Sequence, residues 1–210
     1  SLRMSGEQKF KEGDSLAFSV ETTNKDEILV FSDQFQCSKA RLNDFADGKA
    51  SALGDFVASK LEYDEGESSL YMVHTRDYSG FMIFVFDNGR ISKVPLKSYE
   101  TKTNRKKLIK AYCEKHKIHT ILYFKEDCDI LLKSTNNRML LVSTASIPAK
   151  TTKDNGGIAV MTQKKGQRIF TVEPYVNDSL DNPHRYRTKN LPAAGALPQK
   201  DQATQTTLDI

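Results

Sequence analysis

Hydrophobic positions along this chain come in short runs that end at turn-forming residues, and one run shows the pattern most clearly. Residues 81–86 are all apolar and rich in β-forming side chains, and Asp87-Asn88-Gly89 follows directly. An Asn-Gly pair between two such runs is the strongest short-range signal for a β-hairpin. The basic residue Arg90 opens the next run, so the pattern predicts a hairpin over residues 81–94.

The same alternation of short β-forming runs and turns recurs along the chain. The first three runs predict a three-stranded antiparallel meander, and we expect the later runs to form similar contiguous units. Residues 42–47 read as a loop, and residues 54–61 fit either one strand or a helical turn. The expected strands are 15–21, 27–31, 34–39, 69–74, 81–86, 90–94, 119–124, 129–135, 138–142, 158–161 and 167–172.

Equivalent positions of these units are regularly spaced. The units begin near Leu16, Leu70, Thr120 and Ile169, which are 54, 50 and 49 residues apart. A period near 50 built from short strands is typical of a bladed β-array, in which neighbouring sheets bury each other's faces. We therefore expect an all-β array over residues 1–175, with units at about 15–68, 69–118 and 119–168 and an incomplete last unit. Residues 176–210 read as a Pro-rich, partly disordered tail, of which we expect part, at 184–190, to pack along a blade.

Charge divides the chain more sharply than its net value of +4 suggests. Residues 1–89 hold 9 basic and 16 acidic side chains, residues 90–117 hold 10 and 2, and residues 118–210 hold 12 and 9. A basic block in the middle of the chain indicates either a polyanion partner or a solvated loop. Because no aromatic residues alternate with its lysines, stacking on single-stranded bases is disfavoured.

Other chemistry finds little support in the sequence. No apolar run reaches the roughly 18 residues that span a bilayer, and the polar residues 1–13 predict no signal peptide. A start at Ser1 rather than Met indicates either a fragment or a processed chain, and three scattered cysteines favour a reducing cytoplasm. The spacing of Cys113, His116 and His119 matches no zinc module, so we expect no metal and no cofactor. We find no catalytic constellation and assign no catalytic residue.

The units resemble the C-terminal repeats of the A subunits of DNA gyrase and topoisomerase IV. The residues that carry the resemblance are 129–138 and 84–90, each an apolar strand followed by a turn and an arginine, and 153–161 with 165–169, a glycine loop, strand and turn. The resemblance covers about residues 15–175. It implies a β-pinwheel, a propeller-like disc of four-stranded blades, of which we expect about four here.

The resemblance also implies a function. The family's domain binds duplex DNA on a basic rim and bends it, without catalysis, while the full enzyme changes DNA topology with ATP. Expected partners are therefore double-stranded DNA, the ATPase B subunit, and the rest of the A subunit, with no membrane. The arginine-rich box of gyrase members is missing, and its nearest counterpart, residues 150–157, has no arginine, which favours a chain of the topoisomerase IV type. A protein-interaction scaffold with an acidic working surface is the alternative.

Candidate DNA contacts are the basic residues of the inter-strand loops and those that follow the turns. We expect the basic block to contribute most, with weaker candidates Arg185, Arg187 and Lys189 in the tail. The predicted DNA-binding residues are Lys39, Arg41, Arg90, Lys93, Lys97, Lys102, Arg105, Lys106, Lys107, Lys110, Lys150, Lys153, Lys164, Lys165 and Arg168.

Overall fold

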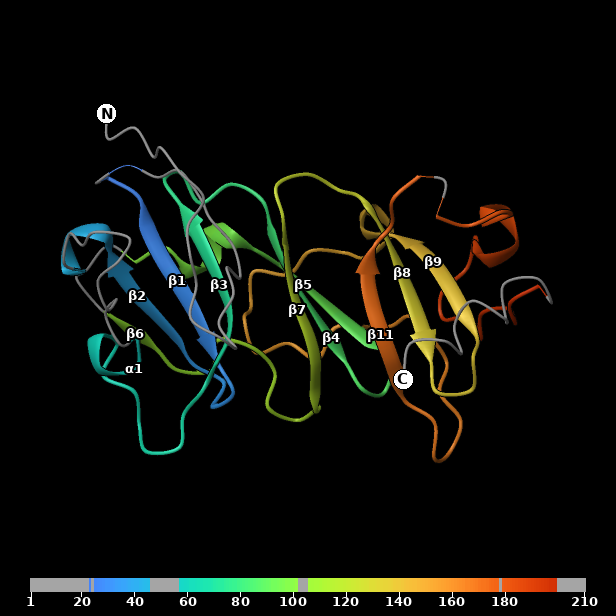
Figure 1. Cartoon of the computed structure of the whole chain (residues 1–210), viewed down its shortest axis with the longest axis horizontal. Coiled ribbons are helices and arrows are strands. Elements are labelled where there is room, and N and C mark those ends of the chain that lie inside the picture. Colours follow the sequence, from blue (N-terminus) through green and yellow to red (C-terminus); the bar gives the residue numbers. More distant parts are fainter. Residues whose placement is uncertain (1–22, 24, 46–56, 102–105, 178, 200–210) are drawn as a thin grey trace, which may run out of the picture.

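The computed structural model describes residues 23, 25–45, 57–101, 106–177 and 179–199, and there the chain is almost entirely β-structure (Figure 1). The expected all-β fold is confirmed, and in the described part of residues 54–61 the alternative is resolved as a helical turn, α1. The expected strand 15–21 lies outside the described residues. The elements are β1 (Glu27–Ser32), β2 (Cys37–Arg41), η1 (Leu42–Asp44), α1 (Val57–Lys60), β3 (Ser69–Thr75), β4 (Phe81–Phe86), β5 (Arg90–Pro95), η2 (Leu96–Tyr99), β6 (Lys107–Leu108), β7 (Ile118–Phe124), β8 (Asp129–Ser134), β9 (Met139–Ser143), η3 (Thr144–Ser146), β10 (Ile158–Ala159), β11 (Ile169–Pro174) and η4 (Pro183–Tyr186).

Three antiparallel sheets are built around three hairpins. Sheet A has the order β3-β1-β2-β6, sheet B has β10-β5-β4-β7, and sheet C has β11-β8-β9. Ala196 adds an antiparallel bridge to Met139 at the free side of β9. In sheets A and B the hairpin is therefore flanked by two segments that lie on either side of the next hairpin in the sequence, and in sheet C the flanks are β11 and Ala196.

This pairing corrects the contiguous units expected from the sequence. The sequence groups the strand 69–74 with 81–94, but β3 pairs with β1, from Glu27↔Thr75 to Ser32↔Ser69. The strands expected to begin a fourth unit instead complete earlier sheets, since β10 pairs with β5 and β11 with β8. The local pattern identifies strands but not partners, and the exchange covers hairpin edges that a contiguous meander would leave unpaired.

The sheets stack along the long axis of the molecule, from sheet A at the left of Figure 1 to sheet C at the right. Strand β4 lies in the middle and is buried on both faces. Met82 and Phe84 point into the core shared with sheet A, whereas Ile83 and Val85 point into the core shared with sheet C. A strand buried on both faces needs no polar alternation, which explains the uninterrupted apolar run at 81–86.

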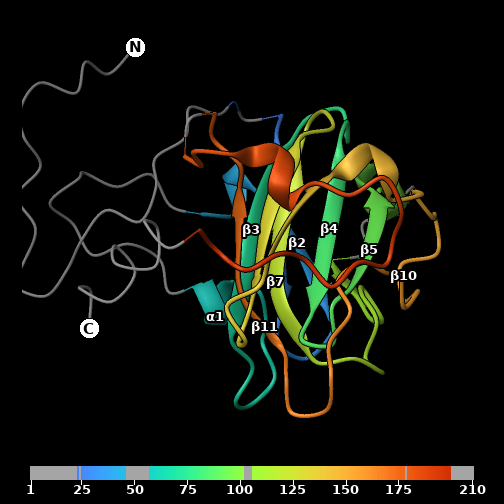
Figure 2. The same cartoon turned by 90° about the vertical axis from the view of Figure 1, so that its right-hand side faces the viewer.

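The two ends of the stack are covered by segments of irregular structure. Leu61 and partly buried Phe45 pack on Val30 at the outer face of sheet A. At the other end, Leu180 and Tyr186 pack on Met139 and Leu141 of sheet C. Figure 2 shows this second end, with the chain around η4 and beyond running across the sheet. The expected contact of residues 184–190 with a blade is thus present, and residues 200–210 lie outside the described part.

Candidate nucleic-acid interface

All three hairpin turns point to the same edge of the stack, the lower edge in Figure 1, which we call the turn edge. The turns place one residue each in the left-handed region, at Phe35 (φ 57°), Gly89 (φ 80°) and Asn137 (φ 61°). At Gly89 a side chain is excluded, because a Cβ would lie 1.9 Å from the carbonyl oxygen of Met161. The Asn-Gly turn therefore sets both the hairpin register and the path of a neighbouring loop.

Beside each turn runs a connector that leads into the flanking strand. The connectors are residues 61–68, 109–117 and 160–168, and we call them the first, second and third connector. A backbone hydrogen bond from the turn reaches the last residue of each, at Ser68 (3.0 Å), Lys117 (3.0 Å) and Arg168 (2.9 Å). The three connectors are therefore structural equivalents, and they follow one another along the turn edge (Figure 1).

Their charges differ in sign. The first connector contains four acidic residues and no basic one, the second contains three basic residues and one acidic, and the third contains three basic residues and no acidic one. The basic residues of the second and third connectors form a strip that we call the basic strip. Its members, all exposed, are Lys110, Lys115, Lys117, Lys164, Lys165 and Arg168.

Core contacts hold the connectors that carry the strip. In the second connector, the Tyr112 ring stacks on Phe84 at 5.2 Å, and its buried hydroxyl donates to the Ser32 carbonyl at 2.6 Å. In the third, the Ser134 hydroxyl donates to the Gln163 side-chain oxygen at 2.7 Å. Lys117 is the one strip member with an ion pair among the described residues, 3.5 Å from Asp87 and 81% exposed. The cations thus stand on anchored loops with their charges open to solvent.

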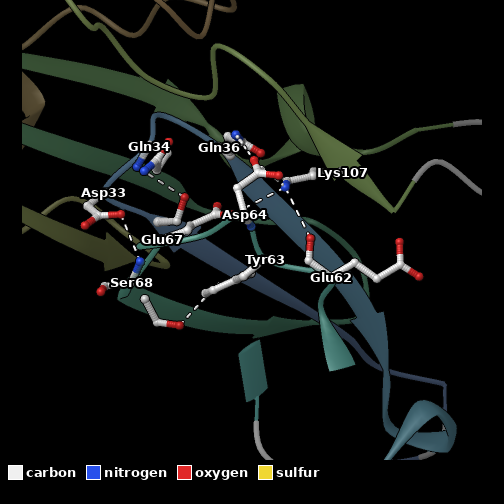
Figure 3. A network of polar contacts seen from close by, with 11 residues as sticks. Asp33, Gln34, Gln36, Glu62, Tyr63, Asp64, Glu67, Ser68 and Lys107 are labelled. Atoms are coloured by element: carbon white, nitrogen blue, oxygen red, sulfur yellow. Dashed lines mark hydrogen bonds and ion pairs between the residues drawn. The ribbon is translucent and has the colours of Figure 1, made fainter. Parts of the chain in front are cut away.

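Lys107, a predicted DNA contact, is engaged by the first connector instead. Its ammonium group lies 3.0 Å from an Asp64 oxygen and 3.3 Å from a Glu67 oxygen, and it donates to the Glu62 carbonyl at 3.4 Å (Figure 3). Burial lowers the pKa of Lys107, but the hydrogen bonds to Asp64 and Glu67 outweigh it and the pKa is raised. This lysine neutralises acidic side chains of its own protein.

Two further predicted contacts are buried. Lys39 is 8% exposed, and its ammonium group donates to Thr101 at 3.0 Å and lies 3.5 Å from Glu27. Lys93 is 5% exposed, and its ammonium group lies 2.5 Å from Asp127 and 4.4 Å from the centre of the Phe81 ring. Both amines are held inside the protein, where phosphate cannot approach them.

Arg90 acts as a brace between two repeats. Its guanidinium donates to the carbonyls of Gly156 (2.9 Å) and Gly157 (2.6 Å), in the loop that leads into β10. Arg138 stands at the equivalent position after the third turn and donates to Gly195 at 2.7 Å. The arginine that follows a hairpin turn therefore fastens the segment that completes the sheet.

The remaining predicted residues are scattered away from the turn edge or lie outside the described residues. Arg41 and Lys97 are exposed and lie near acidic partners, Glu27 at 3.7 Å and Glu100 at 2.6 Å. Lys106 and Lys150 are exposed, and Lys153 is half-buried. Lys102 and Arg105 fall in the range that the structure does not describe. In the tail, Arg185 donates to the Leu197 carbonyl at 3.2 Å, Arg187 pairs with Asp129 at 2.5 Å, and Lys189 is exposed.

Sequence reasoning passed over Lys115 and Lys117, which belong to the strip. The available signal was the repeat itself: Lys117 and Arg168 are 51 residues apart, as are the strands that follow them, at Ile118 and Ile169. The repeat also relates Arg138 to Arg90, 48 residues earlier, and this spacing was the signal for the equivalent role of Arg138.

The histidines and cysteine weighed as metal ligands point to separate partners. Cys113 is buried in the core, His116 packs edge-on against Phe86 with its Nδ1 3.2 Å from Asn88, and His119 Nε2 meets the Phe170 carbonyl at 3.0 Å. Within the described ranges, no three His, Cys, Asp or Glu side chains gather as a metal site would require. In the same part of the chain, no helix has the length and apolarity to cross a membrane.

Comparison with solved structures identifies the fold. The C-terminal domain of a DNA topoisomerase IV superposes with a TM-score of 0.70 at 20% identity, covering 81% of this chain and 53% of that one. The E. coli ParC C-terminal domain superposes with a TM-score of 0.69 at 12% identity, covering 91% and 84%. The expected β-pinwheel fold is thus confirmed, and the chain spans about half the length of the first of these structures. Comparison of the sequence with protein-family models and with curated proteins finds no match.

Proposed function

We propose that this chain is a non-catalytic domain of a type IIA topoisomerase A subunit that binds duplex DNA on the turn edge and bends it. The observation that carries the proposal is the basic strip, six exposed cations on two anchored and structurally equivalent connectors. The topoisomerase IV C-terminal domains that share the fold support the choice of DNA as the polyanion.

The strip suits phosphate groups better than bases. Lysine and arginine side chains on loops contact backbone phosphates, which fix the position of a duplex without reading its sequence. The two connectors belong to adjacent sheets, and stacked sheets are spaced by about 10 Å. Cations on successive sheets draw a duplex along the edge of the stack, and this attraction supplies the energy for bending.

In the full-length protein, we propose that the domain holds a DNA segment beside the remainder of the A subunit. Strand passage and ATP hydrolysis then belong to that remainder and to the ATPase B subunit, both of them in the cytoplasm. The inferred contribution of this chain is to bind and shape the DNA substrate.

Replacement of Lys164, Lys165 and Arg168 by glutamate tests the proposal. Removal of one phosphate contact lowers the slope of log affinity against log salt by about 0.9, so the slope should fall by up to about three such units in the triple variant, on every duplex sequence alike. A matched control reverses the charge of Arg41, Lys97 and Lys150, which are exposed away from the turn edge. Titration of a labelled duplex at several salt concentrations provides the measurement.

Equal reductions in the two triple variants would reject the turn edge as the site. If the wild-type chain binds no duplex even at low salt, the DNA proposal fails. That outcome would favour an interaction scaffold that works through the acidic first connector.

A further inference from the structure

The turn edge presents an acidic connector where its repeat equivalents are basic. The backbone bonds to Ser68, Lys117 and Arg168 place the three connectors at corresponding positions beside successive turns. A duplex that follows the turn edge from sheet C through sheet B would therefore meet the first connector next. The charge of that connector decides whether the contact continues.

Internal pairing neutralises only part of the acidic charge. Asp64 and Glu67 contact Lys107, and the Glu67 side chain is fully buried. Glu62 and Glu65 are exposed, and neither makes an ion pair among the described residues. In the described part of the chain, their carboxylates are thus exposed negative charges without an ion-pair partner.

We infer that the first connector ends the DNA path, so that the duplex contacts sheets B and C and leaves the domain before sheet A. This inference rests on the proposed function. Exposed charges interact over a Debye length of about 10 Å at 0.1 M salt, which matches the spacing of about 10 Å between stacked sheets. Phosphates aligned by the second connector therefore come within range of Glu62 and Glu65, and the repulsion turns the duplex away.

The double variant Glu62→Lys, Glu65→Lys tests this by gain of binding. It makes the first connector resemble the other two, and we expect the contact to extend to sheet A. The slope of log affinity against log salt should then steepen by up to about two units, for two added phosphate contacts. The shortest duplex that gives full affinity should also lengthen by about three base pairs, the equivalent of about 10 Å.

The matched control is Glu126→Lys, Glu173→Lys, which changes the net charge equally on exposed residues at the opposite ends of the strands. We expect this control to leave the salt slope and the minimal duplex length at wild-type values. Circular dichroism of both variants verifies that the fold is retained.

The outcomes separate this inference from the proposed function. If the wild-type chain binds duplex but the Glu62/Glu65 variant matches it in slope and minimal length, the path does not end at the first connector. Equal gains in both double variants would also overturn the inference, because they would attribute the effect to net charge. Absence of wild-type binding refutes the proposed function itself.

Discussion

Arg90 provides a sharp test of whether a basic residue after a hairpin turn serves the fold or the DNA. Its two hydrogen bonds reach Gly156 and Gly157 across 66 and 67 residues of sequence. Hydrogen bonds from a charged donor contribute about 1.5–3 kcal/mol each. Both glycines are only half-buried, so water can replace the guanidinium at their carbonyl groups. The two hydrogen bonds together therefore contribute less than the sum of two such values. We expect Arg90→Ala to reduce the free energy of unfolding by about 2–3 kcal/mol.

Urea unfolding followed by far-UV circular dichroism measures this reduction, since the chain has no tryptophan. For a chain of this size, the same change lowers Tm by roughly 4–12 °C. Arg41→Ala is the matched control: Arg41 is 64% exposed and its ion pair to Glu27 measures 3.7 Å, so its effect should stay within about 0.5 kcal/mol. The salt slope of DNA binding should remain at the wild-type value in the folded Arg90 variant.

The bracing role would be refuted by Arg90→Ala protein that unfolds at the same urea concentration as wild type. A lower salt slope in that stable variant would show that Arg90 contacts phosphate after all.

Two further predictions concern stability. Hydrogen bonds from Lys93 and Thr144 hold the pKa of Asp127 below its usual range; a carboxyl with a lowered folded-state pKa stabilises above its unfolded pKa of about 3.9 and loses this contribution as pH falls. Asp127→Asn should therefore flatten the decline in the free energy of unfolding between about pH 5 and 2. Urea titrations at several pH values measure this decline, and a decline as steep as that of the wild type would contradict the prediction. Gly157→Ala should lower the free energy of unfolding by about 2 kcal/mol or more, because the φ of Gly157 is +64° and a Cβ there would lie 2.0 Å from the Ile91 carbonyl oxygen. Thermal unfolding measures this loss. Gly166→Ala is the control for backbone strain alone, because Gly166 also has a positive φ (81°) but a Cβ there would meet no atom within 4 Å.

The sequence was sufficient for the longer strands because their signals are local, but it assigned the two-residue β6 (Lys107–Leu108) to a loop. The run 81–86 forms β4 as predicted, and the turn at Asp87-Asn88-Gly89 connects it to β5. Strand partners were not predictable, because pairing β3 with β1 depends on which hairpin edge lies nearby in space. The pattern of hydrophobic and polar residues within a strand does not indicate which strand it pairs with.

The candidate site was predicted in part, and for a comparable reason. Lys164, Lys165 and Arg168 are exposed as expected, but Lys39 and Lys93 are buried on strands and Lys107 is taken up by acidic residues. A count of positive charges cannot distinguish these states, because each depends on a carboxylate or hydroxyl brought from elsewhere in the chain. Aligning the connectors at their spacing of about 50 residues would have separated the strip from the rest.

The exchange of flanking strands also sets the order in which a growing chain can fold. Sheet A needs β6, which ends at Leu108, although its own hairpin is complete at Arg41. Sheet B similarly waits for β10, which ends at Ala159, and sheet C receives its last bridge from Ala196. During synthesis, sheets A and B therefore close only after the following hairpin has been made. A chain cut between two repeats would lose both flanks of the sheet before the cut, so shortening by one hairpin would disrupt two sheets.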